Sequence, residues 1–281
     1  MSSSNKNMQI FKILVLVVCI FLAILSLFPF VIMIVNSTRS TTQIQQHAVS
    51  LIPSKYFLNN FRILTGKSFN PAKGFMNSLI ISIGVCACSL YFSTLTAYAL
   101  VMYEWKLRNA FFGFIMGIMM IPATVTIIGF FQMVYKVHMT NHLIVLILPA
   151  IASPSMVFFM RQYMKPAVSV SLVESARIDG SNEFWTYNAI VLPIMKPAIA
   201  TQAIFTFVTS WNDLFRPSVI LTSQSKYTLP IMVSLLNGDI YKREHGAIYV
   251  GLTLTALPLI VVYFILAKYI VAGVALGSVK G

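Results

Sequence analysis

The stretch VESARIDGSNEFWTYNAIVLPIMKP, residues 173–197, is polar over much of its length and lies between two long apolar runs. The chain around it is 58% hydrophobic and only 10% charged, with a mean hydropathy of +0.81. Soluble domains carry about 25% charged residues, so water cannot be the only solvent of this chain. The polarity of residues 173–197 therefore predicts a segment that stays outside the bilayer.

The apolar runs around this stretch are long enough to cross a membrane, which takes ~20 mostly apolar residues per helix. Six segments qualify: Ile10–Val35, Phe75–Met102, Ala110–Val134, Leu143–Met160, Ala198–Leu221 and Ala247–Ala272. Their apolar residues are continuous and do not alternate, which favours helices over a barrel. The sequence thus predicts an all-α membrane protein with six transmembrane helices, the first retained as an anchor because bulky residues follow it.

Several of these spans contain proline, at Pro29, Pro122, Pro149, Pro154 and Pro258. Proline in a membrane bundle is tolerated where neighbouring groups satisfy the freed carbonyls. Broken helices often line transport pathways, but for any single proline a packing kink is the simpler interpretation.

Charge and cysteine content exclude several classes of protein. The formal charge of +13 comes from basic residues scattered singly along the chain, so they form no nucleic-acid patch and are interpreted as anchors at span ends. With the N-terminus placed inside, ten Lys and Arg fall on each side, so charge alone does not orient the chain. Cys19, Cys86 and Cys88 lie in apolar runs and predict no disulfide framework or zinc site.

No motif for catalysis or metal binding is found in the sequence. Gly66-Lys67-Ser68 looks like the end of a P-loop, but Phe61 stands where the first glycine belongs. His138 and His142 lie four residues apart in a short loop without a third ligand. The chain is therefore expected to be neither an enzyme nor a cofactor or metal binder, and its energy source must be another chain.

The stretch around residue 173 has the marks of an ordered helix–turn–helix. Ser171 and Glu174 fit a capping box at the start of a helix that runs to about Ile178. Gly180 can take the left-handed conformation that ends this helix, and Ser181 or Asn182 can cap a second helix. That second helix is expected to end before Pro193, because the residue before a proline disfavours helical geometry.

Phe184 and Trp185 are unusual residues for a polar loop. Simple capping explains Glu174 and Gly180, but it does not explain two large aromatic side chains outside the spans. An exposed aromatic patch predicts a partner, which is either the bilayer interface or another protein.

The spacing in this stretch resembles a known signature. Glu174-Ser175-Ala176, then Gly180 after three residues, then Ile190-Val191-Leu192-Pro193 after nine more, resembles the EAA motif of ABC-importer permeases, EAA-x3-G-x9-I-x-LP. ARIDGSNEFW is similar to the maltose-type, carbohydrate-uptake branch, as are six further segments along the chain: MNSLIIS (76–82), TAYAL (96–100), MMIP (119–122), RQYM (161–164), SWNDLFRP (210–217) and VKG (279–281). Two departures are Ser175, where alanine is usual, and KPAVSVSL (165–172), in which the family's usual proline and acidic residues are absent after Pro166.

The resemblance implies that the helix–turn–helix is a cytoplasmic coupling element that docks on an ATPase. The residues that would carry the coupling are Glu174, Ser175, Ala176, Asp179, Gly180, Phe184, Ile190 and Pro193. A C-terminal tail with Lys280 and Gly281 would reach between the two ATPase subunits, which bind ATP and Mg²⁺. The N- and C-termini would then be cytoplasmic, in a bacterial inner membrane.

The segment Trp211-Asn212-Asp213 lies near the outer end of the predicted fifth span. Counted from Lys196, Asp213 is ~25 Å along the helix at 1.5 Å per residue. An ionisable group near a span is a functional hypothesis, so these residues are candidates for the translocation path. An interfacial anchor with an Asp213–Arg216 ion pair is the alternative.

The leading interpretation, which the resemblance implies, is a permease subunit of an ATP-driven ABC importer that takes up an oligosaccharide. It divides the chain into residues 1–74, an anchor span with a long extracytoplasmic loop, and 75–281, a core permease domain of five spans that includes the coupling loop 161–197. Its partners would be a second, different permease subunit, two ATPase subunits, an extracytoplasmic sugar-binding protein facing 36–74 and 222–246, and the lipid bilayer. A same-family permease for a polyol or glycerol phosphate is the runner-up. A stand-alone secondary transporter is poorly supported, because few ionisable groups lie at mid-membrane, and a non-transporting membrane scaffold is a third class.

Overall fold

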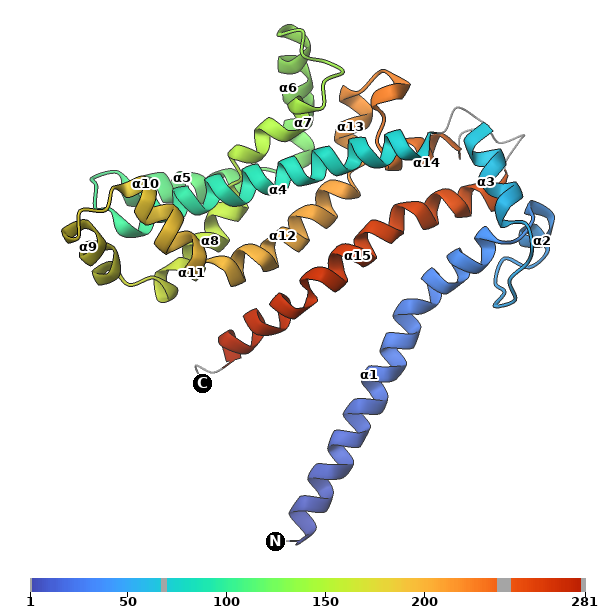
Figure 1. Ribbon diagram of the computed structural model, residues 1–281, viewed down its shortest axis with the longest axis horizontal. Coiled ribbons are helices and arrows are strands. Elements are labelled where there is room, and N and C mark those ends of the chain that lie inside the picture. Colours follow the sequence, from blue (N-terminus) through green and yellow to red (C-terminus); the bar gives the residue numbers. More distant parts are fainter. Residues whose placement is uncertain (1, 67–69, 237–243, 279–281) are drawn as a thin grey trace. The chain divides into compact units, whose positions relative to one another are not determined.

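The structure is a computed structural model that describes residues 2–66, 70–236 and 244–278, and its regular elements in these ranges are all helical (Figure 1). The α-helices are α1 Ser2–Ser37, α2 Thr41–Gln46, α3 Phe57–Gly66, α4 Pro71–Met102, α5 Arg108–Met119, α6 Ala123–Lys136, α7 Ile144–Ile147, α8 Pro154–Ala167, α9 Val170–Ile178, α10 Glu183–Trp185, α11 Leu192–Ile194, α12 Lys196–Trp211, α13 Phe215–Ile220, α14 Leu229–Leu236 and α15 His245–Ser278. This architecture confirms the all-α prediction for the described part of the chain.

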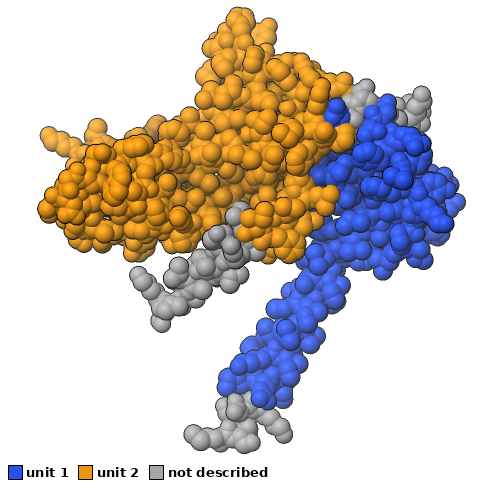
Figure 2. All heavy atoms as spheres, viewed as in Figure 1, with its two compact units in different colours: residues 1–70, 233–256 blue, residues 71–232, 257–281 orange. Residues whose placement is uncertain are grey.

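Two compact units make up the chain, and Figure 2 colours them separately. The first consists of residues 1–70 and 233–256, and the second of residues 71–232 and 257–281. The sequence-based division at residues 74 and 75 concerns function and stays a prediction.

In the first unit, the polar segment after α1 is ordered. The Arg39 side chain is buried and donates hydrogen bonds to Asn36 Oδ1 (2.9 Å), His47 O (2.7 Å) and Gln43 O (2.9 Å). The buried Asn60 Nδ2 donates to Ser37 O (2.9 Å) and Arg39 O (2.8 Å). These bonds fix α2 and α3 against the end of α1, where the sequence was read only as a long polar connection.

The second unit is built around α4, which packs against α8 and α12. Met160, Met164, Tyr187, Val191 and Met195 are fully buried in the core between these helices and the segment 170–195. Toward the N-terminal end of α4, Asn77 Nδ2 donates to Ser225 O and Tyr227 O at 3.0 Å each, and Ser78 Oγ accepts from Leu229 N at 3.0 Å. Toward the other end, Tyr98 contacts Glu183. From Asn77 to Tyr98 the helix rises by about 32 Å at 1.5 Å per residue, which matches the ~30 Å hydrocarbon core of a bilayer.

Several predicted spans are broken rather than continuous. Ala110–Val134 divides into α5 and α6 around Met120–Pro122, and Leu143–Met160 is bent by 42° between its first half and α8. Pro122 and Pro154 lie at these breaks, because proline lacks the N–H that continues a helix. Pro29 and Pro258, by contrast, lie inside unbroken helices.

The predicted fifth span, Ala198–Leu221, is also wrong as a continuous helix. It stops at Trp211, and α13 begins at Phe215. Asp213 Oδ1 accepts a hydrogen bond from Arg216 N at 3.3 Å, and this side-chain acceptor competes with a continued helix. In the described residues, three helices are long and apolar enough to cross a membrane, and five segments are if each bent pair counts as one span.

Candidate functional site

Residues 169–195, here called the elbow, form a folded turn of helices at the C-terminal end of α4 (Figure 1). The first helix, α9, begins at Val170, and its cap is Ser169, whose Oγ accepts from Leu172 N at 3.3 Å. The predicted capping box at Ser171 and Glu174 is therefore wrong. Val168 is buried in the core, which leaves Ser169 extended (φ −76°, ψ 141°) at the point where the helix starts.

Gly180 ends α9 as the sequence predicted. Its φ is +82°, a region that costs a side chain with a Cβ roughly 1–2 kcal/mol. Gly180 N donates to Arg177 O (3.0 Å), and Ser181 N donates to Ala176 O (2.9 Å). This pair of bonds satisfies the last carbonyls of α9 and fixes the direction in which the chain turns.

The second helical run begins at Glu183 and is capped by Asn182, whose Oδ1 accepts from Trp185 N at 2.8 Å. The sequence predicted that this run ends before Pro193, but the run continues to Ile194. Thr186–Val191 forms a wider π-helical turn in which Leu192 N bonds Tyr187 O, five residues back. In a regular α-helix a proline ring clashes with the carbonyl four residues back, and the π-helical turn directly before Pro193 departs from that regular pattern.

Four side chains, here called the latch, hold the elbow on the end of α4: Tyr98, Tyr103, Arg177 and Glu183. Arg177 Nε donates to Glu183 Oε1 at 2.6 Å, and Tyr98 Oη donates to Glu183 Oε2 at 2.7 Å. The Arg177 guanidinium lies over the Tyr103 ring, 5.0 Å from its centroid. The latch thus ties both helical runs of the elbow to α4 and to the residue that follows it.

Electrostatics of the latch stabilise its charged state. The hydrogen bond from Arg177 is the largest cause that lowers the pKa of Glu183 to about 2, and partial burial opposes it. The same bond raises the pKa of Arg177. Both side chains remain partly exposed, at 33% and 45%, so solvent screens the ion pair and reduces its contribution to stability.

Sequence reasoning missed the latch. Arg177 and Glu183 flank the Gly180 turn, and this local signal of opposite charges was available. The contact from Tyr98 crosses 85 positions of the chain, and no periodicity in the sequence encodes it. Tyr187 is buried, and its hydroxyl donates to Tyr91 O at 2.9 Å.

The predicted coupling residues divide into an exposed and a covered set. Ala176 is buried and Ile190 is partly buried. The exposed set consists of Glu174, Ser175, Asp179, Gly180, Phe184 and Pro193. Large apolar side chains stand in this exposed surface, with Ile178 86%, Phe184 74% and Trp185 55% accessible. Ile178 was not singled out from the sequence, although it widens the apolar patch beyond the two aromatic residues.

The three candidate residues of the translocation path differ in exposure and in contacts: Trp211, Asn212 and Asp213. Trp211 is 1% exposed and packs on Phe207 (ring centroids 5.5 Å apart) and edge-on to Phe75 (5.6 Å). Asn212 is exposed, and Asp213 forms an ion pair with Arg216, as the sequence predicted. The indole is thus a core side chain within this chain, whereas the amide and carboxylate lie at the helix end.

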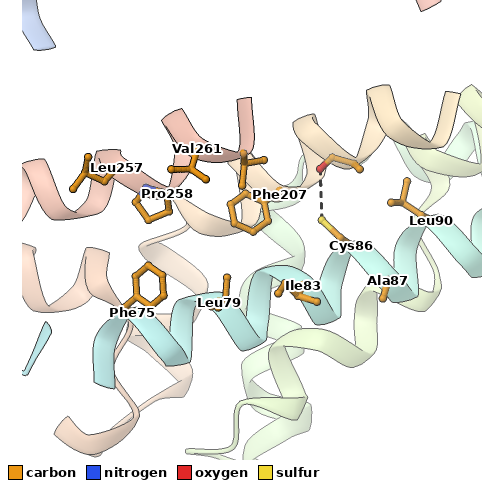
Figure 3. A pocket seen from close by; sticks show the side chains of 12 residues that line it. Phe75, Leu79, Ile83, Cys86, Ala87, Leu90, Phe207, Leu257, Pro258 and Val261 are labelled. Carbon is orange, nitrogen blue, oxygen red and sulfur yellow. Dashed lines mark hydrogen bonds between the residues drawn. The ribbon is translucent and has the colours of Figure 1, made fainter. Parts of the chain in front are cut away.

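An apolar groove runs along α4 between α12 and the middle of α15 (Figure 3). Its volume is about 670 Å³, and its walls include Phe75, Ile83, Phe207 and Pro258. The thiol of Cys86 lies in the wall and contacts Ala203 O at 3.6 Å. Sugar recognition needs hydrogen-bonding groups, so these walls suit an apolar cover and not a carbohydrate.

Two further predictions concern the tail and metal binding. Lys280 and Gly281 lie outside the described residues. In the described ranges, no group of three or more His, Cys, Asp or Glu side chains is placed to hold a metal ion.

Comparisons with known proteins agree with the resemblance noted in the sequence. Residues 89–276 match the family model described as binding-protein-dependent transport system inner membrane component. The arabinooligosaccharides transport system permease protein AraQ of Halalkalibacterium halodurans is 35% identical over 263 residues, which cover 93% of this chain and 94% of that protein. The lactose transport system permease protein LacG of Rhizobium radiobacter is 31% identical over 258 residues, 92% of each chain.

The fold also matches a solved structure. A chain from the crystal structure of a bacterial ABC transporter involved in the import of the acidic polysaccharide alginate superposes with a TM-score of 0.80, at 24% identity, over 93% of this chain and 97% of that one. The predicted family of carbohydrate-uptake permeases is thereby confirmed.

Proposed function

Because the chain belongs to the family of binding-protein-dependent transport system inner membrane components, we propose that it is one permease subunit of an ATP-driven ABC importer for an oligosaccharide. The chain is a transport permease and not an enzyme. The cargo follows from the relatives, whose names specify arabinooligosaccharides and lactose. An extracytoplasmic binding protein delivers this cargo.

The elbow is the proposed contact with the ATPase. The observation that carries this role is the exposed apolar patch of Ile178, Phe184 and Trp185 on a segment that the latch fixes to α4. An exposed apolar patch with polar residues around it is typical of a protein interface. Glu174 and Asp179 are exposed in the same elbow and offer carboxylate acceptors to the partner.

The proposed topology has six spans, with the elbow and both termini in the cytoplasm. The third, fourth and fifth spans contain breaks, which a bundle tolerates where protein covers the freed backbone groups. The elbow and the contacts of Asn77 lie about one bilayer thickness apart along α4, which supports placing residues 222–229 on the extracytoplasmic side. Loops 36–74 and 222–246 then face the binding protein.

The remaining partners follow from this arrangement. A second, different permease subunit covers apolar surface such as the groove in Figure 3. Two ATPase subunits bind ATP and Mg²⁺, and the tail with Lys280 and Gly281 reaches between them. Asn212 and Asp213 contribute to the translocation path, with Trp211 as the buried side chain that holds this helix end in place.

The test is reconstitution of the purified importer in proteoliposomes with its binding protein. Uptake of a labelled oligosaccharide that requires internal ATP is the expected result, with no uptake of a polyol or glycerol phosphate. Uptake that persists without ATP, or without a co-purifying ATPase, supports a secondary transporter and contradicts the proposal.

A further inference from the structure

Arg108 and Arg161 lie together near the elbow end of the second unit. Arg108 is the first residue of α5, Arg161 lies on α8, and these two helices pack against each other. The positive charges of the two side chains are near enough to repel each other. Two ion pairs occur among the described residues, Arg177–Glu183 and Arg216–Asp213, so neither of these two arginines has an acidic partner there.

Arg161 is held in place by aromatic rings, and its buried Nε donates to none of the described residues. Its guanidinium lies over the Phe112 ring, 3.9 Å from the centroid, and Phe158 stacks with the same ring at 6.5 Å. Arg108 Nη1 donates to Tyr103 O at 3.2 Å. A guanidinium cannot lose its charge in a protein. The two permanent positive charges of this pair therefore attract an anion.

The surroundings show where that anion comes from. Exposed apolar side chains occur close to both arginines in the sequence: Leu107 and Phe111 near Arg108, and Phe159 two residues before Arg161. Trp105 is also exposed, and its ring lies 5.8 Å from that of Phe111. Exposed apolar residues next to a tryptophan and basic side chains are typical of the level at which a bilayer meets water. Lipid headgroups lie at this level.

We propose that Arg108 and Arg161 bind the phosphate of an anionic phospholipid between α5 and α8. Guanidinium groups present paired N–H donors that match phosphate oxygens, and basic pockets between transmembrane helices bind anionic headgroups. Phe112 fixes the guanidinium plane of Arg161, while Leu107, Phe111 and Phe159 contact the acyl chains. This site is independent of the cargo.

The experiment measures lipid retained by the assembled importer, purified from nanodiscs of phosphatidylcholine with a minor fraction of phosphatidylglycerol. Native mass spectrometry identifies each retained molecule by its mass, which separates a lipid from free phosphate. The wild-type complex is expected to retain phosphatidylglycerol in preference to phosphatidylcholine. Arg161→Gln and Arg108→Gln are each expected to lower that retention about tenfold, as loss of one charge-assisted hydrogen bond predicts.

Two matched variants sharpen the result. Lys136→Gln removes one charge from an exposed position at the end of α6 and should leave retention unchanged. Arg161→Lys keeps the charge but loses the paired donors, so its retention should be intermediate. Arg108→Gln leaves the Arg161–Phe112 contact intact and serves if Arg161→Gln fails to assemble.

Four results overturn the proposal. The first is equal retention of the two lipids by the wild-type complex, and the second is wild-type retention by both glutamine variants. The third is loss of a partner subunit from the variants while phosphatidylglycerol stays bound, since the arginines then serve a protein contact. A retained mass equal to phosphate alone also contradicts a lipid site.

Discussion

Replacing Glu183 by glutamine tests the latch directly. The side chain keeps its shape and one acceptor oxygen, but it loses the negative charge that faces Arg177 at 2.6 Å and Tyr98 at 2.7 Å. The ion pair is partly exposed, so its contribution is about 0.2–1 kcal/mol. Tyr98 is buried, and a hydrogen bond from such a group to a carboxylate contributes about 1.5–3 kcal/mol, part of which glutamine retains.

The sum of these effects is a loss of about 1–2 kcal/mol, felt locally where the elbow meets α4. Opening of the elbow should therefore become about 5–30 times more frequent. Hydrogen exchange measures this opening through the amides of Ser181 and Trp185, which bond Ala176 O and Asn182 Oδ1 in the closed elbow. Coupling should weaken as well, so that fewer sugar molecules are taken up per ATP hydrolysed.

Glu174→Gln is the matched control, because it removes the same charge from an exposed position of the same elbow. Its exchange protection should equal that of the wild type. Equal protection in Glu183→Gln and the wild type would refute the reasoning, since Glu183 would then not hold the elbow. Loss of protection throughout α4 and α8 would also refute it, because the variant would have disrupted the whole unit.

Three further predictions follow from the same geometry. The depressed pKa of Glu183 means that its stabilisation is complete above pH 4.5 and is lost as pH falls towards about 2, so the difference in exchange protection between the wild type and Glu183→Gln should vanish over that range. Gly180→Val should destabilise the elbow by roughly 1–2 kcal/mol at φ +82°, and it should abolish ATP-coupled uptake while membrane insertion stays normal. Gly180→Asn should keep much of the uptake, because asparagine tolerates this conformation. Normal uptake by Gly180→Val contradicts the coupling role. Gly246→Ala places a Cβ 2.6 Å from Arg39 O and should lower thermal stability by about 1–3 kcal/mol, whereas Gly113→Ala meets nothing within 4 Å and should be neutral or stabilising; equal melting temperatures would contradict the close packing at Gly246.

The correct predictions depend on interactions between residues that are close together in the sequence. Continuous apolar runs predicted helices, and Gly180 before Ser181 predicted a left-handed helix end. The cap of α2 was equally local and was overlooked: Ser40 and Gln43 form a reciprocal capping box, and this Ser-x-x-Gln pattern is a known start signal. The cap of α9 was misplaced by two residues, because both Ser169 and Ser171 precede an apolar run and only the burial of Val168 decides between them.

The parts that could not be predicted depend on contacts between distant segments. Tyr98 meets Glu183, Asn77 meets Tyr227, and Asn141 Nδ2 donates to Ser223 Oγ at 2.6 Å. Each contact pairs polar groups more than 80 positions apart in the chain, and single-sequence periodicity carries no such information. The continuation of the elbow through Pro193 likewise depends on a π-helical turn, whose hydrogen bonds no proline rule anticipates.

The same contacts suit α4 to the proposed transmission of movement from the elbow. α4 is unbroken over 32 residues, whereas the segments around α5–α8 and α12–α13 contain breaks that can bend. A continuous helix is stiff, so a displacement that the latch imposes near Tyr98 reaches Asn77 with little loss. There Asn77 and Ser78 bond the segment 225–229, and a Cβ on Gly74 would lie 2.8 Å from Met232 Sδ. The elbow and the segment after α13 are thus attached to opposite ends of one rigid element, so a displacement of the elbow that moves α4 must also move residues 225–232.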